Sequence, residues 1–357
     1  MTPLRPGSTI GIVGGGQLGR MLSMSAARLG FRVVVLAREP DSPAGQVSAE
    51  EIVGRYDDLA AVAELARRSD ILTFEFENIA AETLLAVGDT PIAPPARALA
   101  ISQDRLDEKT FLNGLGIDTA PFAAIAAASD IPPALGRLGA PALLKTRREG
   151  YDGKGQAWVT SADEAVTAFA SIGARPAVLE GLVGFTRELS VIAARGWNGE
   201  VTAYPLGENR HEQGILRTTL APAVASGETQ ARALGIARTL MDALDYVGVI
   251  GVELFELAGG ALLVNEFAPR VHNSGHWTMD GTEVDQFEQH IRAIAGWPLG
   301  PTHALARTEM TNLIGEDVSD WRRLASDPTA RAWFYGKREA APGRKMGHVN
   351  RLVGPAK

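Results

Sequence analysis

The stretch VIGVELFELAGGALLVNEFAPR, residues 249–270, predicts two neighbouring β-strands joined by a tight turn. Apolar runs flank a Gly-Gly pair at 259–260, and such a pair is favoured in two-residue hairpin turns. A two-residue turn at these glycines places Glu253 directly opposite Glu266. A three-residue turn would instead place Glu253 opposite Asn265, so the pairing depends on the turn.

Two carboxylates that face each other repel, and a bound cation is the simplest reason to keep them together. Mg²⁺ prefers oxygen ligands and usually takes one or two carboxylates together with substrate phosphates. We therefore predict Glu253 and Glu266 as metal ligands. The alternative is a pair of glutamates on a solvated strand face, which the apolar neighbours Val252, Leu254 and Phe267 disfavour.

The segment that follows, EFAPRVHNSGHWT at 266–278, contains two of the six histidines of the chain. A zinc site, a solvated loop and an anion-binding wall beside a metal carboxylate are its three possible interpretations. Zinc is disfavoured because His272 and His276 have no thiolate partner in a chain without cysteine. The planar guanidinium of Arg270 suits a planar anion such as a carboxylate, which it can bind with two parallel hydrogen bonds.

A glycine-rich segment, KTRREGYDGKGQ at 145–156, lies between two predicted strands. Its three glycines, with Lys145, Lys154 and Asp152, are typical of a hairpin loop whose amides and ammonium groups can cover a triphosphate. No GK[ST] sequence or helix follows, so this is not a strand-to-helix phosphate loop. A mobile surface hairpin is the alternative.

The N-terminal segment 8–37, STIGIVGGGQLGRMLSMSAARLGFRVVVLA, predicts a strand, a helix and a second strand, with Gly30 ending the helix. The pattern Gly14-x-Gly16-x-x-Gly19 after the first strand is the context of a dinucleotide fingerprint. A nicotinamide site also needs an acid at the end of the second strand, and the candidate acid is displaced to Glu39. Tight packing or another ligand are the alternatives.

Two weaker signals lie in the middle of the chain. In LEGLVGFTRELS, residues 179–190, Glu180 ends one strand and Glu188 lies on the next, so this edge could bind an adenine and a ribose. His211 in NRHEQGILRTT is ambiguous by itself. The alanine-rich AAIAAASD at 123–130 is interpreted as a linker.

The totals favour a multidomain globular protein. Its 357 residues exceed the usual limit for one core, and the 45% hydrophobic and 22% charged residues are ordinary values. A net charge of −7 argues against a nucleic-acid or membrane-surface partner. We expect a cytoplasmic protein, because the N-terminus has no signal-peptide pattern and no apolar run reaches about 18 residues.

Several motifs together carry a resemblance to a known family. GGGQLGRML at 14–22, GYDGKGQ at 150–156, Asn265-Glu266, APRVHNSGHWT at 268–278 and PGRKMGH at 342–348 occur in the order found in one group of ATP-grasp enzymes. The chain resembles the 5-(carboxyamino)imidazole ribonucleotide synthases of purine biosynthesis over nearly its whole length. RVHNSGHWT is highly specific for this group, whereas G-x-G-x-x-G alone is not.

The resemblance implies a mixed α/β and α+β chain with an ATP-grasp fold. Residues 1–104 would form an open parallel-sheet, Rossmann-like pre-ATP-grasp domain, residues 105–300 the ATP-grasp domain, and residues 301–357 a small C-terminal domain. It implies carboxylation of 5-aminoimidazole ribonucleotide with ATP, Mg²⁺ and bicarbonate through carboxyphosphate, in a homodimer that binds no nucleic acid and no membrane. A nicotinamide-dependent dehydrogenase and a non-catalytic nucleotide-binding regulator are the rival functions.

The resemblance also assigns site residues, in addition to the metal ligands Glu253 and Glu266. The residues implied for ATP are Arg105, Lys145, Gly150, Tyr151, Asp152, Gly153, Lys154, Gly155, Gln156, Glu180, Gly181, Leu182, Val183, Glu188, His211, Asn265 and Glu266. Those implied for the ribonucleotide are Gly16, Gln17, Leu18, Glu75, Asn78, Tyr151, Asn273, Ser274, Lys337, Arg344 and Lys345. The residues implied for the chemistry are Arg270, His272 as a proton relay, and Asp152, which would orient the amine.

Overall fold

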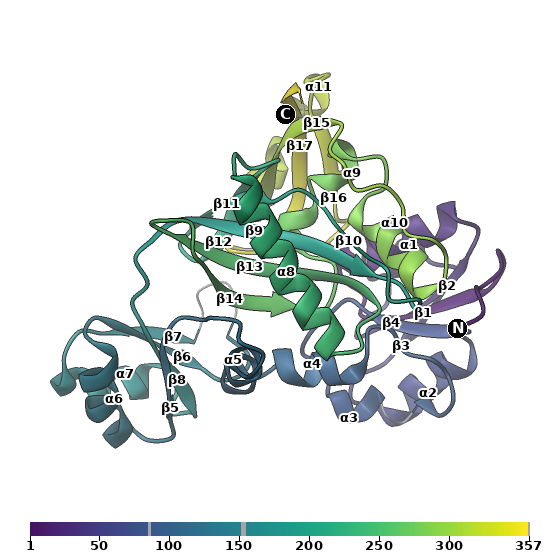
Figure 1. Cartoon of the computed structure of the whole chain (residues 1–357). Helices are drawn as coiled ribbons and strands as arrows, with labels where there is room; N and C mark the ends of the chain where they lie inside the picture. Colours follow the sequence, from purple (N-terminus) through teal and green to yellow (C-terminus); the bar gives the residue numbers. More distant parts are fainter. Residues whose placement is uncertain (85–86, 151–154, 356–357) are drawn as a thin grey trace.

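The computed structural model describes residues 1–84, 87–150 and 155–355. Within these residues the strands form three sheets, which Figure 1 shows as an N-terminal part, a small sheet at the lower left and a large central sheet. The mixed α/β fold agrees with the prediction. None of the described helices has both the length and the apolar character that a membrane span requires.

The N-terminal sheet is parallel and open, as the sequence predicts. Its strand order is β3-β2-β1-β4, and its strands run in register from Thr9↔Arg32 to Val13↔Leu36 between β1 and β2. Gly30 has φ +85° where the first helix ends, which a side chain would disfavour. The elements are β1 (Thr9–Val13), α1 (Gln17–Arg28), β2 (Arg32–Ala37), β3 (Glu50–Val53), α2 (Leu59–Arg67), β4 (Ile71–Phe74), α3 (Ala81–Leu84) and α4 (Ala96–Ser102).

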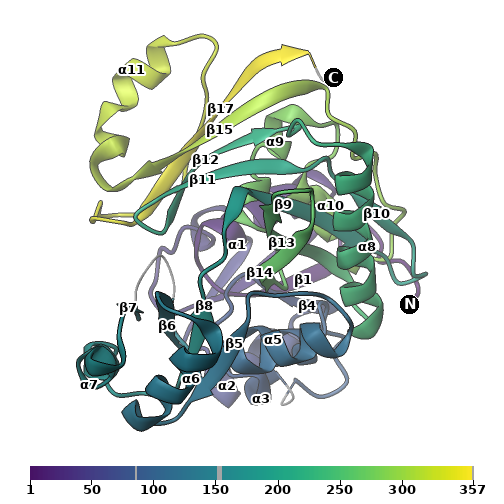
Figure 2. The same ribbon diagram turned by 60° about the vertical axis from the view of Figure 1, so that its left-hand side comes forward.

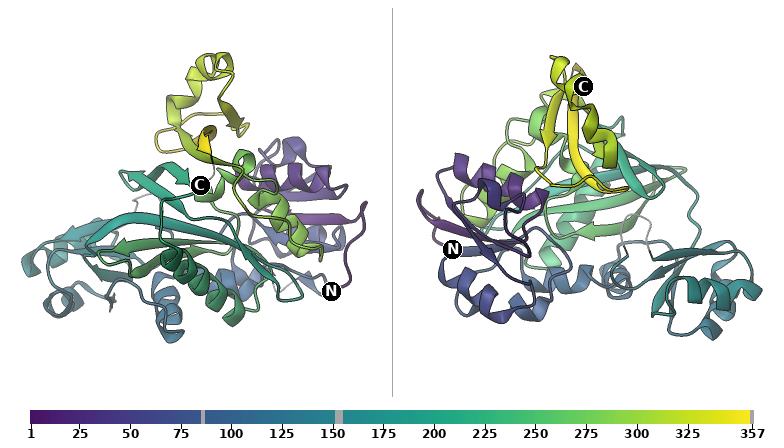
Figure 3. Two further views of the ribbon diagram at one scale, coloured as in Figure 1. Left: turned by 45° about the horizontal axis from the view of Figure 1, so that its top comes forward. Right: turned by 180° about the vertical axis from the view of Figure 1, so that it is seen from behind.

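The small sheet is antiparallel with the order β5-β8-β6-β7 and extends away from the rest of the molecule in both views of Figure 3. The linker predicted at 123–130 is wrong in part, because β5 runs through its first half. Ala123 and Ile125 alternate into the core beneath the sheet, so alanine here packs rather than connects. The elements are α5 (Arg105–Gly114), β5 (Phe122–Ile125), α6 (Ile131–Leu138), β6 (Ala142–Thr146), β7 (Gln156–Val159), α7 (Ala165–Ser171) and β8 (Ala177–Gly181).

The central sheet is antiparallel, and its order in the described residues is β14-β13-β9-β11-β12-β15-β17-β16, with β10 beside β9. The amphipathic α8 packs on one face, as Figure 1 shows. The elements up to residue 300 are β9 (Phe185–Arg195), β10 (Val201–Ala203), β11 (Gly207–Glu212), β12 (Ile215–Ala221), α8 (Gly227–Ala243), β13 (Gly248–Leu257), β14 (Leu262–Ala268), α9 (Thr278–Gly281) and α10 (Gln286–Ile294).

The C-terminal segment continues this central sheet. Its first strand pairs antiparallel with β12 from Thr218↔Thr311 to Ala221↔Thr308, so hydrogen bonds run on into the last part of the chain. Figure 2 shows these strands stacked above β11 and β12. The elements are β15 (Ala306–Ile314), α11 (Trp321–Ser326), β16 (Arg331–Phe334) and β17 (Lys345–Pro355).

Candidate active site

A cleft of ≈ 1020 Å³ lies where the N-terminal part, the small sheet, the central sheet and the C-terminal segment meet. Most of the residues that the sequence singles out line it. They are Gly16, Gln17, Leu18, Glu75, Asn78, Arg105, Lys145, Gly150, Gly155, Gln156, Glu188, His211, Glu253, Asn265, Glu266, Arg270, His272, Asn273, Lys337, Arg344 and Lys345.

The other predicted residues fall into two groups. Tyr151, Asp152, Gly153 and Lys154 lie outside the described residues. The remaining ones do not line the cleft: Glu180 and Ser274 are buried beside it, and the end of β8 and the turn after it provide Gly181, Leu182 and Val183.

The carboxylate pair lies on the β13–β14 hairpin, where Glu253 pairs with Glu266 as predicted. The predicted two-residue turn is wrong. The turn contains three residues, and Leu257 N donates to Ala261 O at 2.8 Å across it. The register changes between Glu253 and Leu254, so one extra residue, Asn265, is accommodated as a β-bulge. The bulge restores the pairing that the longer turn would have removed.

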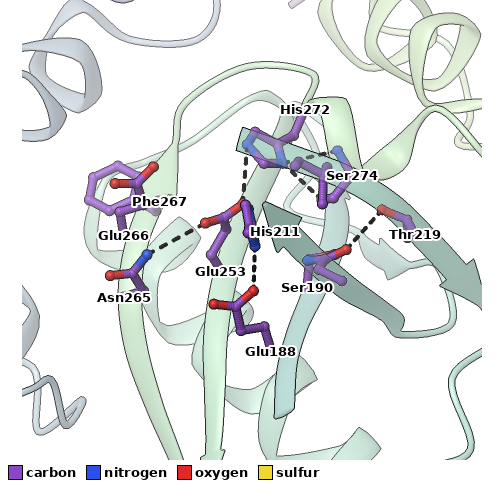
Figure 4. Close-up of polar contacts among 12 residues, drawn as sticks. Glu188, Ser190, His211, Thr219, Glu253, Asn265, Glu266, Phe267, His272 and Ser274 are labelled. Carbon is purple, nitrogen blue, oxygen red and sulfur yellow. Dashed lines mark hydrogen bonds and ion pairs between the residues drawn. The ribbon is translucent and has the colours of Figure 1, made fainter. Parts of the chain in front are cut away.

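The two carboxylates have different electrostatic surroundings. Arg105 Nη1 donates to Glu266 Oε2 at 3.0 Å. Burial opposes ionisation of Glu266, but the charges of Arg105 and Lys145 outweigh it and lower its pKa to about 2. Burial and the charge of Glu266 raise the pKa of Glu253 to about 7. Figure 4 shows the Asn265 amide pointing at Glu253, with Nδ2 3.5 Å from Oε2.

These residues fit a magnesium ion. Glu253, Glu266 and Asn265 offer the hard oxygen donors that Mg²⁺ prefers, and the raised pKa of Glu253 shows how unfavourable the pair is without a cation. In the part of the chain that the structure describes, no group of three or more His, Cys, Asp or Glu side chains is arranged to hold a metal alone.

A buried cluster of cations lies next to the pair. Glu180 Oε2 accepts from Lys145 at 2.9 Å, and its Oε1 lies 3.2 Å from Lys109 Nζ. Burial opposes ionisation of Glu180, but both lysines outweigh it and keep its pKa below the usual range. The Glu180 side chain therefore orients two lysines.

Glu188 and His211 face each other across β9 and β11, and the carboxylate contacts His211 Nδ1 (Figure 4). Burial would lower the pKa of His211, but the hydrogen bond that its ring donates to Glu188 and the charge of Glu253 outweigh it and raise this pKa. The carboxylate of Glu188 thus has a fixed direction at the cleft wall.

The two histidines of the loop after β14 lie in different surroundings. His272 lines the cleft with Nε2 3.7 Å from Glu253 Oε1, and its Nδ1 accepts from the backbone N–H of Ser274 at 3.4 Å. This contact assigns the ring proton to Nε2. Burial, reinforced by Arg270, lowers the pKa of His272 to about 3. His276 is buried in the core and bonds Gln286.

Arg270 and Asn273 line the same cleft. Arg270 Nη2 lies 3.0 Å from Glu77 Oε1, and Nη1 donates to Val271 O at 2.9 Å. Among the described residues, neither polar side-chain atom of Asn273 has a hydrogen-bond partner, although both are buried. A buried amide that lacks partners and lines a cleft is suited to a ligand.

The glycine-rich turn before α1 holds one of the protein's own carboxylates. Glu75 Oε1 accepts from Gly16 N at 2.8 Å, and Oε2 accepts from Gly19 N at 3.2 Å. A Cβ on Gly14 would lie 2.4 Å from the Glu75 side chain. The amides that would bind a pyrophosphate in a dinucleotide enzyme are therefore occupied, which removes the physical basis of the nicotinamide alternative.

The basic C-terminal cluster closes the cleft on the side of the N-terminal part. Lys337 Nζ donates to Lys345 O at 2.6 Å, and Arg344 Nη1 donates to Glu339 O at 2.9 Å. Gln46 Nε2 donates to Gly336 O at 3.1 Å, and this contact joins the segment to the loop after β2. The cluster therefore reaches the cleft through a contact between distant parts of the chain.

The sequence analysis missed several charged residues that contact the residues it identified. Glu77 pairs with Arg270, while Glu108 and Lys109 lie behind Glu266. For Glu108 and Lys109 the one available signal was the charged run Asp107-Glu108-Lys109. In the structure this run lies on α5, and two of its three residues are buried. A charge run on a helix is normally solvent-exposed, so the pattern alone did not distinguish them.

Comparisons with known proteins give a consistent result. Family models match an ATP-grasp domain at 110–287, a ribonucleotide synthetase preATP-grasp domain at 7–103 and a phosphoribosylaminoimidazole carboxylase C-terminal domain at 308–354. The N5-carboxyaminoimidazole ribonucleotide synthase of Brucella melitensis is 51% identical over 354 residues, covering 98% of each chain. That of Bacillus subtilis is 42% identical over 355 residues, covering 98% of this chain and 93% of the relative.

Solved structures agree over almost the whole chain. An ADP complex of an N5-carboxyaminoimidazole ribonucleotide synthetase has a TM-score of 0.95 at 40% identity, with 99% of this chain and 94% of that chain covered. An Aspergillus clavatus N5-carboxyaminoimidazole synthase in complex with ADP and 5-aminoimidazole ribonucleotide has a TM-score of 0.92 at 32% identity, with 98% and 95% covered. The chain therefore belongs to the N5-carboxyaminoimidazole ribonucleotide synthases, which are ATP-grasp ligases of purine biosynthesis.

Proposed function

We propose that this chain carboxylates the exocyclic amine of 5-aminoimidazole ribonucleotide, using ATP and bicarbonate and releasing ADP and phosphate. Bicarbonate attacks the γ-phosphate to give carboxyphosphate, which releases CO₂ next to the amine. The observation that carries the proposal is a cleft in which the Glu253–Glu266 pair lies beside the half-buried cations Arg105 and Lys145. Such a site neutralises phosphate charge and excludes water from a short-lived anhydride.

ATP would lie between the small sheet and the central sheet. Arg105 and Lys145 would contact its phosphates, with Gly150, Gly155 and Gln156 beside them at the described ends of the glycine-rich loop. The end of β8, residues 180–183, would bind the adenine. Glu188, held by His211, would accept from the ribose hydroxyls. Tyr151, Asp152, Gly153 and Lys154 keep the roles that the sequence predicts.

Magnesium would be held by Glu253 and Glu266, with Asn265 beside them. Bound there, it would neutralise charge on the β- and γ-phosphates and so favour attack at phosphorus. Glu266 would exchange its present contact with Arg105 for the ion, which leaves the guanidinium available to a phosphate.

The ribonucleotide would occupy the end of the cleft formed by the N-terminal part and the C-terminal segment. Asn273 lines the cleft, and its amide has no hydrogen-bond partner in the part of the chain that the structure describes. The basic cluster would bind the 5′-phosphate, because charge-assisted hydrogen bonds to phosphate are strong. The residues proposed to contact the ribonucleotide are Gly16, Gln17, Leu18, Glu75, Asn78, Asn273, Lys337, Arg344 and Lys345.

Arg270 and His272 would handle the carboxyl group between these two ligands. Arg270 would orient bicarbonate and the carboxylate of carboxyphosphate through its planar guanidinium. His272 presents Nε2–H to the cleft, so it would donate a hydrogen bond to the anion and hold it as the anhydride breaks. The proton that the amine loses on carboxylation would go to the phosphate that leaves the anhydride. Ser274 would support His272 from behind rather than touch the ribonucleotide.

ADP release with ATP and Mg²⁺ tests this function, with bicarbonate and aminoimidazole ribonucleotide added separately and together. We expect full turnover and a carboxylated product only when both are present. A non-catalytic regulator would release no ADP, and ADP release that needs neither co-substrate would contradict the proposal.

The proposal also includes the domain limits 1–104, 105–300 and 301–357, a homodimer and a cytoplasmic location. These rest on the family and on the composition of the chain. Light scattering of the purified protein tests the homodimer, and cell fractionation tests the location.

A further inference from the structure

Helix α5 packs along β14, which is the edge strand of the central sheet. An edge strand presents backbone N–H and C=O groups that no neighbouring strand satisfies. Two adjacent side chains of α5 satisfy such groups here. Glu108 Oε1 accepts from Phe267 N at 2.7 Å, and Lys109 Nζ donates to Asn265 O at 3.4 Å.

The residue between these two contacts is Glu266. A third side chain of the same helix, Arg105, bonds its carboxylate at 3.0 Å. Figure 4 shows Asn265, Glu266 and Phe267 in succession along β14, with Glu253 on the neighbouring strand. One turn of helix thus contacts the backbone on both sides of a proposed metal ligand and its side chain.

The contact from Glu108 matters because of the β-bulge. The extra residue Asn265 interrupts the regular ladder next to Glu266, so pairing with β13 alone constrains this backbone less than in a regular strand. Glu108 is 2% exposed, and its carboxyl oxygen is the acceptor that the structure gives to the Phe267 N–H. The carboxyl group of Glu108 therefore fixes the peptide that carries Glu266.

We propose that Glu108 is a positioning residue for the metal site: by holding the Phe267 N–H it keeps the bulged strand in the shape that points Glu266 at Glu253. Loss of this contact would weaken the affinity of the nucleotide site for Mg²⁺. The inference rests on the proposed function for the identity of the ligands, but it concerns binding and not carboxylation.

Charge is the competing explanation, because a buried carboxyl near Arg105 and Lys109 could act through its field. Burial and the charge of Glu266 raise the pKa of Glu108 to about 8. Two substitutions separate the explanations. Glu108→Gln keeps an acceptor oxygen at the same reach and removes the ionisable group. Glu108→Asp keeps an ionisable carboxyl and withdraws the oxygen by one methylene.

The affinity for ADP is measured by calorimetry over a series of Mg²⁺ concentrations, for the full-length chain and its variants. We expect the Mg²⁺ concentration at which Glu108→Gln reaches half of its maximal ADP affinity to lie within about threefold of that of the unchanged protein. Glu108→Asp and Glu108→Leu should need about 10 to 100 times more, as is typical when a group that orients a metal ligand is removed. Thr110→Val, on an exposed position of the same helix, should change nothing.

An unchanged Mg²⁺ requirement in Glu108→Asp overturns the proposal, and so does a Glu108→Gln variant impaired as strongly as Glu108→Asp. If Glu108→Leu does not fold, the other two variants still decide, because each keeps a polar side chain of similar size. A chain that binds ADP with Mg²⁺ as expected but makes no carboxylated product would refute the proposed function and leave this inference intact.

Discussion

Glu266 is the residue on which Arg105, the proposed metal and the β-bulge converge. Replacement by glutamine removes one negative ligand while preserving the shape, so Glu266→Gln should nearly abolish ADP release without unfolding the protein. ADP release measured by a coupled assay, together with thermal unfolding, checks this. Glu283→Gln is the matched control, because Glu283 is an exposed surface residue that pairs with His303.

Activity of Glu266→Gln within about threefold of the unchanged enzyme would mean a loss of under about 1 kcal/mol in the barrier, and the metal assignment would then be wrong. Glu253→Gln should be impaired in the same direction but less. Full activity in both variants would support the alternative interpretation, in which the two glutamates bind no metal.

Arg270 makes contacts in two directions, to Glu77 Oε1 and to Val271 O. A lysine retains the positive charge but cannot make both contacts and also bind a carboxylate through two parallel bonds. Arg270→Lys should therefore lose most of the carboxylation and need more bicarbonate for half-saturation. Unchanged kinetics for this variant would refute the proposed role.

His272 is held on its Nδ1 side by Ser274, so only Nε2 faces the cleft. Without the imidazole, carboxyphosphate should hydrolyse before its carboxyl group reaches the amine. We expect His272→Ala to form less carboxylated product per ADP, measured by quantifying both products in one reaction. A ratio equal to that of the unchanged enzyme would place His272 outside the transfer step.

At the residue level, the sequence was informative where a charged residue stands among apolar ones. Glu253, Glu266 and Arg270 were found because their type is unusual beside apolar neighbours. Glu108 and Lys109 were missed because the sequence pattern of a buried charged residue on a helix does not differ from that of an exposed one.

Among the elements, the segment between β16 and β17 brings Lys337 and Arg344 to the cleft. Lys337→Ala should raise the concentration of ribonucleotide needed for half-saturation and leave that of ATP unchanged, because the two ligands would occupy different ends of the cleft. Steady-state kinetics with each substrate varied checks this, with Arg323→Ala on the exposed face of α11 as control. An effect on ATP alone would contradict the assignment.

The elements themselves were largely predictable, since long periodic segments such as α1, α5 and the β13–β14 hairpin follow from apolar spacing. The bulge at Asn265 was not, because it depends on how α5 and β13 hold both edges of one strand. The sequence therefore predicted the correct pairing of Glu253 with Glu266 from a turn that is one residue too short.

For the molecule as a whole, buried neutral histidines predict sensitivity to acid. Burial lowers the pKa of His290 and of His348 to about 3. His290 Nε2 bonds Thr73 of the N-terminal sheet at 2.8 Å, and its Nδ1 accepts from Val249 N of the central sheet at 3.1 Å. Protonation would therefore break a link between two sheets.

Between pH 3 and about 6.5 the unfolded chain binds more protons at these histidines than the folded one. The free energy of unfolding should thus be highest above this window and fall by up to about 1.4 kcal/mol per pH unit for each histidine as the pH drops. Urea unfolding at pH 7, 6 and 5 measures this. His290→Gln should be less stable at pH 7 with a shallower pH slope, while His303→Gln, at an exposed site, should keep the slope. An unaltered slope in His290→Gln would refute the link.

The carboxylate of Glu75 at the start of α1 also has a consequence for inhibitor design. In dinucleotide-binding enzymes the corresponding amides attract pyrophosphate and its mimics. Here an anionic mimic aimed at that turn would meet a carboxylate that already holds those amides, and the two would repel. A compound that places an amine or an amide N–H toward Glu75 would gain a partner instead. Selectivity against dinucleotide-binding enzymes is thus available at the very loop that resembles them most.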